Sequence, residues 1–340
     1  TFTLSSPLPL PTLGTTVPTG TISAMALDFK STYVQQYNLM VQKELKGNVI
    51  SASYVGALGR REARLIPNLN LALPGVGAIN PRRIYAATMP NVTTIAYLDS
   101  GGTSNYQAMQ LAFERRFNKG LTINSNYTWA HGIDDVQLIG GGRPTASGYG
   151  ALVNNLSIER ASGDLDIRHR FALMANYELP FFKSATGFKK HLLTGWQINA
   201  IAYYQTGLAF SVTNSATRSN TGAANDRPNQ IADGNISNPT IARWFDTSAF
   251  VAQTVNTIGT AGRNTLTGPP RRVIDFSIFK QIKITERHRI QLRGEIFNFT
   301  NTPNFNLPDA LLGSASFGTI STTAPGTTPR QIQLGIKYLF

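Results

Sequence analysis

The side chains that could perform acid–base or metal chemistry are few and scattered. His131 stands close to Asp134 and Asp135 in the chain, and a histidine beside a carboxylate can activate water. No second acidic pair lies at a matching position, so a capping or turn role is the preferred interpretation. The four histidines lack the i, i+2 and i, i+4 spacings of metal ligands, and the chain has no cysteine. We therefore expect no catalytic centre, no metal site and no cofactor.

Arginine dominates the charge of the chain. Lys and Arg number 31 against 18 Asp and Glu, which gives a formal net charge of +13. Many arginines, among them Arg168 and Arg170, lie in or beside segments rich in Gly, Pro and Asn. The guanidinium suits two-point contact with phosphate or carboxylate, so these two residues are candidate ligand contacts. A solvated basic rim without a specific ligand is the preferred interpretation. No compact face interleaves basic and aromatic residues, so we expect no nucleic-acid partner.

A second set of charges alternates along two neighbouring segments near the C-terminus. Arg289, Gln291, Arg293 and Glu295 would share one face of a strand. Asp275 would lie on the corresponding face of the preceding strand. Opposite charges on neighbouring strands can pair across a wall that faces water. We therefore prefer a structural ladder for these residues, with contact to a ligand as the alternative.

The elements that must position these residues are β-strands, because apolar side chains recur at every second position. In residues 331–340 one face would carry Ile332, Leu334, Ile336, Tyr338 and Phe340, with polar or small residues between them. The same alternation recurs upstream, mostly in pairs of segments joined by short turns. The predicted strands cover residues 33–44, 49–55, 106–117, 121–129, 170–179, 196–204, 273–282, 290–296 and 331–340.

The composition agrees with strands that have one apolar and one polar face. Of the 340 residues 41% are hydrophobic and only 14% are charged, against about a quarter in ordinary soluble domains. No stretch approaches the roughly 18 apolar residues of a membrane-spanning helix. Residues 58–104, 132–167, 207–272 and 300–330 form four long connections, and loops above about 15 residues are uncommon in compact soluble domains. The pattern predicts an antiparallel up-and-down transmembrane β-barrel with short periplasmic turns and long extracellular loops.

The order of turns and loops fixes the direction of each predicted strand. With the short turns in the periplasm, the final strand runs toward the periplasm and leaves Phe340 at that rim. Nine strands is an odd number, whereas bacterial single-chain barrels have even numbers, so we expect the remaining strands to precede Thr1 in a longer protein. Residues 1–30 are predicted to be an irregular loop segment, and residues 31–340 to be the C-terminal part of the barrel.

Aromatic residues fall near the ends of predicted strands, on their apolar faces. This is typical of the aromatic girdles at the two membrane interfaces, although the core of a soluble β protein would also accept them. The girdle is preferred because the opposite faces of the same strands are polar. Its predicted members are Tyr127, Trp129, Tyr177, Trp196, Tyr204 and Tyr338.

Short motifs recur in a fixed order from about residue 31 onward. They include residues 33–39 (YVQQYNL), 105–111 (NYQAMQL), 166–171 (DIRHRF), 226–229 (DRPN), 244–250 (WFDTSAF), 262–264 (GRN), 293–298 (RGEIFN) and 330–337 (RQIQLGIK). In order and spacing they resemble the C-terminal barrel half of TonB-dependent outer-membrane receptors. The resemblance is strongest to the subgroup with a carboxypeptidase-regulatory-like N-terminal domain, abundant in Acidobacteria and similar to Oar-type receptors.

The resemblance implies a 22-strand barrel closed by a plug domain and powered by the TonB complex. No plug, TonB-box segment or first half of the barrel is present in these residues, so no residue is assigned to energy coupling. The expected location is the bacterial cell outer membrane. The expected partners are outer-membrane lipid and lipopolysaccharide, the TonB complex through the missing N-terminal part, and the barrel-assembly machinery. That machinery would read Tyr338 and Phe340 of the C-terminal strand as an assembly signal.

The function expected on these grounds is ligand capture by the extracellular loops and uptake across the outer membrane, without enzymatic activity. The ligand could be a small molecule, a saccharide or a peptide, and the sequence does not choose among them. A non-transporting structural or adhesion barrel is the alternative. A secreted soluble all-β binding domain is a third interpretation.

Overall fold

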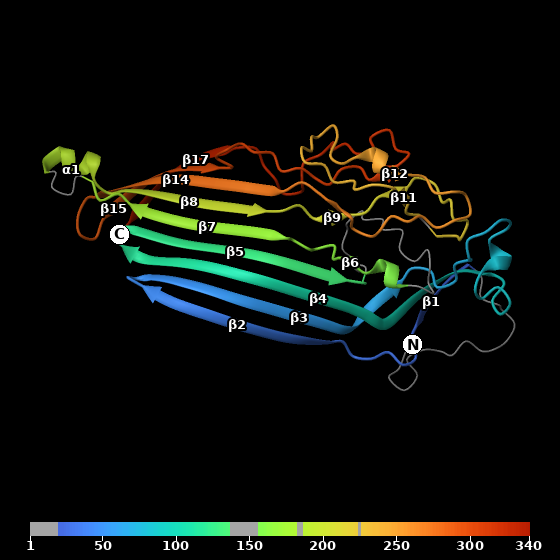
Figure 1. Ribbon diagram of the computed structural model, residues 1–340. Helices are drawn as coiled ribbons and strands as arrows, with labels where there is room; N and C mark the ends of the chain where they lie inside the picture. Colours follow the sequence, from blue (N-terminus) through green and yellow to red (C-terminus); the bar gives the residue numbers. More distant parts are fainter. Residues whose placement is uncertain (1–19, 137–155, 182–185, 224–225) are drawn as a thin grey trace, which may run out of the picture.

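The computed structural model describes residues 20–136, 156–181, 186–223 and 226–340. Its body is one eleven-stranded sheet, in which nine long strands follow one another in chain order and curve into an open wall (Figure 1). The wall consists of β2 (Tyr33–Leu45), β3 (Asn48–Ile66), β4 (Val92–Asn118), β5 (Leu121–Asp134), β7 (His169–Glu178), β8 (Trp196–Gln205), β14 (Arg271–Lys283), β15 (Arg289–Phe297) and β17 (Gln331–Leu339). Neighbouring strands of the wall are antiparallel, which confirms the predicted architecture of a partial barrel.

The pairing register divides the wall into an apolar face and a polar face. Between β15 and β17, Leu292 stands opposite Ile336 and Gln291 opposite Lys337. Since side chains alternate along a strand, each such pair fixes the face of all the others. Leu334 on the apolar face of β17 is 82% exposed, so the described residues leave this part of the face open to its surroundings.

Tight turns gather at one end of the wall, which we call the turn end. Lys46 and Gly47 have φ angles of 51° and 78°, and Lys119 and Gly120 have 52° and 87°. Positive φ at both central residues is the geometry that closes a two-residue hairpin without splaying its strands. The long connections lie at the other end, which we call the loop end (Figure 1). Phe340 lies at the turn end, as predicted.

One connection at the turn end contains a short helix, α1 (Gly187–Leu193). No helix among the described residues is long and apolar enough to cross a membrane. The sequence analysis assigned no helix between the predicted strands 170–179 and 196–204, because seven residues give too little periodicity to reveal one.

Two strands reach more than ten residues further than predicted. β3 continues to Ile66 and β4 begins at Val92, so part of the connection expected at residues 58–104 is paired sheet. The guanidinium of Arg64 holds the carboxylate of Asp99 across this extension, with Nη2 2.8 Å from Oδ2. The pairing depends on contacts between distant residues, which local alternation does not show.

A further strand lies in the segment expected to be irregular. β1 (Gly20–Met25) pairs in parallel with the first part of β4, from Val92 to Leu98. The free edge of β4 supplies the partners, so the strand forms without a strong pattern of its own. Residues 1–19 of the expected irregular segment lie outside the described residues.

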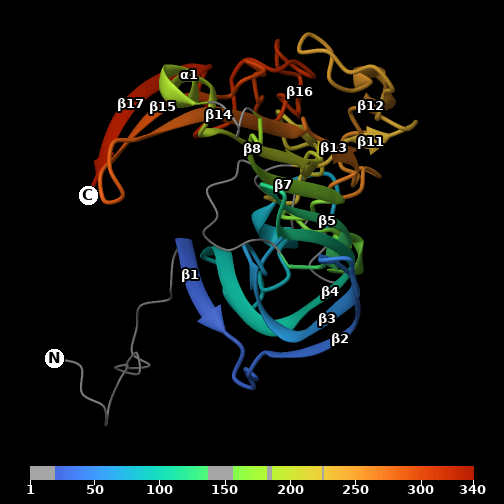
Figure 2. The ribbon, with the colours of Figure 1, turned by 90° about the vertical axis from the view of Figure 1, so that its left-hand side faces the viewer.

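The hydrophobic core lies in the connections at the loop end. Phe245 contacts Phe210, Phe250 and Phe317 edge-on, with ring centroids 5.2 to 5.9 Å apart. Val212, Ala249, Ala261 and Leu266 complete this buried cluster. Short strands pair around it: β9 (Ala209–Phe210) with β13 (Leu266–Thr267), β10 (Thr213–Asn214) with β16 (Leu311–Leu312), and β11 (Asn229–Gln230) with β12 (Phe250–Val251). Figure 2 shows β11 and β12 on the convex side of the curved wall.

Candidate functional site

A cavity of about 420 Å³ opens on the polar face of the wall at the loop end. Its floor comes from β4 and β5, and its rim from the segment that leads into β7. The lining is mixed, with apolar residues such as Leu165 between polar groups. The polar side chains in it belong to Tyr106, Gln110, Thr128, Asp134, Asp166 and Arg170.

Of the two predicted arginines, Arg170 lines this cavity and Arg168 pairs with Asp166, a carboxylate of the lining. The guanidinium of Arg170 lies 5.3 Å from the ring centroid of Tyr203, a cation–π contact that orients the charge. Nη2 of Arg168 lies 3.5 Å from Oδ2 of Asp166. Asp166 also accepts a hydrogen bond of 2.7 Å from the backbone N–H of Gly132. The site therefore contains Arg170, which is stacked on a tyrosine ring, and Arg168, which is already paired with a carboxylate.

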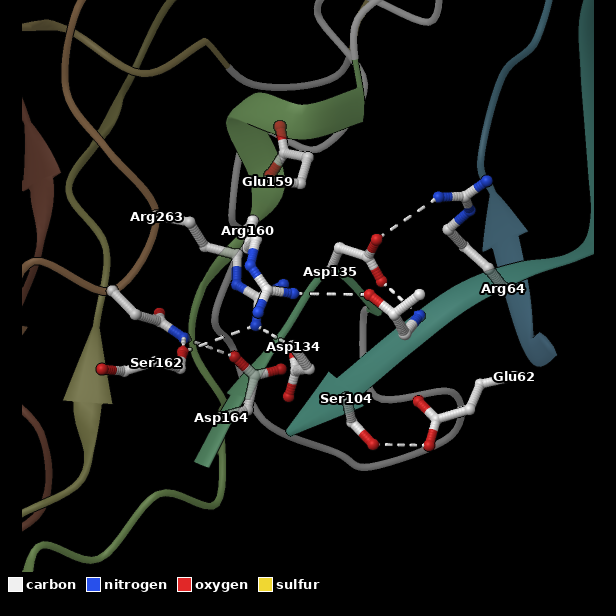
Figure 3. Close-up of polar contacts among 12 residues, drawn as sticks. Glu62, Arg64, Ser104, Asp134, Asp135, Glu159, Arg160, Ser162, Asp164 and Arg263 are labelled. Atoms are coloured by element: carbon white, nitrogen blue, oxygen red, sulfur yellow. Dashed lines mark hydrogen bonds and ion pairs between the residues drawn. The ribbon is translucent and has the colours of Figure 1, made fainter. Parts of the chain in front are cut away.

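A buried polar network fixes the loops above the cavity (Figure 3). Arg263 forms an ion pair with Asp134, at the end of β5, and is almost completely buried. The next residue, Asn264, donates to the backbone carbonyl of Ser162, in β6 (Ala161–Ser162), and to Oδ1 of Asp164, each over 2.8 Å. These contacts attach the β8–β14 connection to the loop end of β5 and to the segment that follows it.

A second anchor joins the same connection to the segment before β7. Both terminal nitrogens of Arg227 donate to the carboxylate of Glu159, each over 2.9 Å. Glu159 belongs to a short 3₁₀ turn, Leu156–Glu159. The neighbouring Asp226 is also buried and accepts from the hydroxyl and backbone N–H of Ser219. The loops are thus held by internal polar contacts as well as by their apolar core.

The other predicted site residues lie apart from the cavity. Asp275 accepts a 2.8 Å hydrogen bond from the backbone N–H of Asn298. Arg293 places its guanidinium 4.9 Å from the ring centroid of Phe279 and donates to Gln291. Arg289 and Glu295 stand opposite Lys283 and Ser277 in the register. Asp275 and Arg293 thus contact a backbone N–H, an aromatic ring and an amide, whereas the expected ladder pairs opposite charges.

The histidine and acids considered for catalysis take part in local structure. Asp135 accepts a 2.6 Å hydrogen bond from the backbone N–H of Thr103, which supports its predicted capping role. Nε2 of His131 lies 3.2 Å from the hydroxyl of Ser162. Within the described part of the chain, no group of three or more His, Asp or Glu residues is arranged to hold a metal ion.

A family model described as outer membrane beta barrel domain matches residues 1–333 of the chain. The chain belongs to that family. In such a barrel the apolar face meets the lipid, the turn end faces the periplasm and the loop end faces outward. This outer-membrane β-barrel therefore lies in the bacterial outer membrane with its cavity on the inner wall near the outer opening. No curated protein matches the sequence.

Solved structures of outer-membrane proteins superpose on the chain. The outer membrane transporter YddB from Escherichia coli superposes with a TM-score of 0.50 and 10% identity, over 96% of this chain and 35% of that one. The pyoverdine receptor FpvA from Pseudomonas aeruginosa gives a TM-score of 0.45 and 10% identity, over 92% and 30% of the two chains. The present chain thus spans about a third of the length of these structures.

Sequence reasoning missed the anchors of this barrel's loops, although two motifs marked their positions. Residues 226–229 (DRPN) contain the buried Asp226 and Arg227, and residues 262–264 (GRN) contain Arg263 and Asn264. Both motifs were noted for their resemblance to receptors, without any role. Glu159, the partner of Arg227, carries no comparable local signal.

Proposed function

We propose that the chain forms part of the barrel of a TonB-dependent receptor that captures a ligand and moves it across the outer membrane. The observation that carries this proposal is the cavity with charged groups on the inner wall, beneath outer loops that buried ion pairs hold in place. A purely structural barrel does not need a cation–π contact between Arg170 and Tyr203, or the carboxylate of Asp166, beside a cavity near its outer opening. Membership of the outer membrane β-barrel family and the fold shared with an E. coli transporter support the proposal.

The proposed complete barrel has 22 strands and encloses a plug. Among the described residues the wall has two free edges, at β2 and β17, and an open edge in lipid leaves backbone groups without hydrogen-bond partners. Further strands would satisfy both edges. The motifs quoted above favour the subgroup with a carboxypeptidase-regulatory-like domain, similar to Oar-type receptors.

Two roles are proposed for the inner-wall charges. Arg168 and Arg170, at the cavity, would contact a ligand with carboxylate or phosphate groups. The other charges lie on the polar face away from the cavity, where they would face a plug domain. They are Asp275, Arg289, Arg293 and Glu295. Binding and passage need no bond-breaking chemistry, so no catalytic activity is proposed.

Nutrient uptake in a deletion strain tests the proposed function. The strain should lose energy-dependent uptake of at least one ligand, and the complete gene should restore it. The same gene should fail to restore uptake when TonB is absent. Equal uptake with and without TonB would contradict the proposal and favour a non-transporting barrel.

A further inference from the structure

A second cavity, of about 310 Å³, opens on the opposite face of the wall. It lies between the end of β8 and the β8–β14 connection, where the residues that border it include Tyr204, Ile236, Pro239, Trp244 and Pro270. Tyr204 belongs to the apolar face, since it stands opposite Phe171 and Arg272 in the register, whereas its neighbour Tyr203 belongs to the polar face. The cavity therefore faces lipid instead of the barrel interior.

The height of this cavity in the membrane follows from β8 itself. Trp196 and Tyr204 lie on the same apolar face at opposite ends of the strand. The eight residue steps between them span about 27 Å of strand. With the tilt of such barrels this is about 20 Å across the membrane, close to the apolar band of about 25 Å. Tyr204 thus marks the outer interface, where acyl chains meet head groups.

The β8–β14 connection extends beyond the loop end of β8 (Figure 1). β11 and β12, in the β8–β14 connection, lie on the convex side of the wall (Figure 2). Trp244 is fixed in place because its indole N–H donates to the backbone carbonyl of Thr267 over 2.9 Å. Its ring therefore lines the cavity in a fixed orientation.

The charges beside the cavity favour an anionic head group. Arg272 is exposed on the same face as Tyr204. The nearby acids already have partners: Asp246 lies 2.9 Å from Arg243 and also binds Ser248, while Asp233 accepts from the backbone N–H of Asn235 over 2.9 Å. The guanidinium of Arg272 is thus the group best placed to meet a phosphate, for which its planar fork is suited.

We propose that this cavity binds one phosphorylated glycolipid of the outer leaflet, lipopolysaccharide, with an acyl chain along Tyr204 and Pro270 and a phosphate at Arg272. The cavity is too apolar for a purely ionic ligand, and it continues a surface already in contact with lipid. An interfacial aromatic pair beside an arginine supplies both the apolar and the charged contact that such a lipid requires. Lipid binding at this cavity does not require the proposed transport function.

The experiment measures the lipopolysaccharide that remains bound to the complete protein after purification in mild detergent. Arg272→Ala should retain about tenfold less, the effect of losing one charge-assisted contact. Arg271→Ala is the matched control, because Arg271 is adjacent in sequence but stands on the polar face opposite Gln205. Tyr204→Ala should also reduce retention. Heat-dependent gel mobility of each variant verifies that the barrel is folded.

A competition between lipids completes the test. The unmodified protein should prefer lipopolysaccharide to the same lipid after enzymatic dephosphorylation, and to phosphatidylethanolamine. Equal losses in the Arg271 and Arg272 variants, no loss in either, or equal retention of the dephosphorylated lipid would each overturn the proposal. Because uptake is measured separately, failure here leaves the proposed transport function untouched.

Discussion

Arg227 and Glu159 are joined by two hydrogen bonds of 2.9 Å although 68 residues separate them in the chain. Both side chains are buried, with 7% and 1% of their surface exposed. Removing one partner of such a pair leaves an uncompensated buried charge, which is far more costly than the loss of a surface contact. The pair therefore holds two outer connections in one arrangement.

Arg227→Ala should destabilise the folded loops by about 3–5 kcal/mol without unfolding the wall. The measurement is the rate of proteolysis within residues 156–160 and 206–270, with gel mobility as the check on the barrel. Arg243→Ala removes an exposed pair with Asp246 and should cost about 0–1 kcal/mol. Equal protease resistance of the two variants would contradict an anchoring role for Arg227.

Gly207→Ala should disrupt the path of the chain where it leaves β8. A Cβ atom at residue 207 would collide with the backbone carbonyl of Gly268, so the two segments would have to separate. We expect a loss of about 1–3 kcal/mol or more, read from thermal unfolding of the loops. Gly335→Ala is the control, because its Cβ would lie 3.9 Å from the nearest side-chain atom. A harmless Gly207 variant would argue against this close approach.

The turn around Asp309 should loosen in acid. Burial acts to raise the pKa of Asp309, but hydrogen bonds from the hydroxyls of Ser314 and Ser316 and from the N–H of Leu311 together lower it below its ordinary value. The folded state favours the ionised carboxylate, so this group stabilises the fold at pH values above its ordinary pKa. The stabilisation is lost as the pH falls through the lowered folded-state pKa. Amide hydrogen exchange at residues 309–318, corrected for intrinsic rates, should therefore accelerate below about pH 4. Asp309→Asn should abolish most of that dependence, and an unchanged acid response in this variant would refute the assignment.

Arg170→Ala should weaken binding of an anionic ligand by about 10- to 100-fold, because a hydrogen bond to a charged group contributes about 1.5–3 kcal/mol. The measurement is ligand affinity on cells once uptake screening has supplied the ligand. Arg289→Ala, at the turn end, should leave affinity unchanged. An equal loss in both variants would indicate a general charge effect instead of contact at the cavity.

The aromatic rings at the C-terminus suggest a role in assembly. Tyr338 lies between His288 and Phe340, with ring centroids 5.7 and 5.8 Å apart, and its hydroxyl is 2.6 Å from Nδ1 of His288. Deleting Phe340 should reduce the amount of protein in the outer membrane, measured by quantitative blotting of membrane fractions. His288→Ala should give a smaller reduction, since Tyr338 loses its hydrogen bond but keeps its position in β17. Normal membrane levels after deletion of Phe340 would count against an assembly signal.

The sequence by itself determined the wall: the nine long strands, their apolar and polar faces, the tight turns at Lys46–Gly47 and Lys119–Gly120, and the position of Phe340. These features are local, because alternation and turn chemistry act between residues close in the chain. Only the tertiary structure decided the rest. The pairing of β1 with β4, the aromatic core around Phe245 and the meeting of Arg227 with Glu159 join segments far apart in sequence. Such contacts depend on where the folded wall brings the loops together, and no local pattern records that.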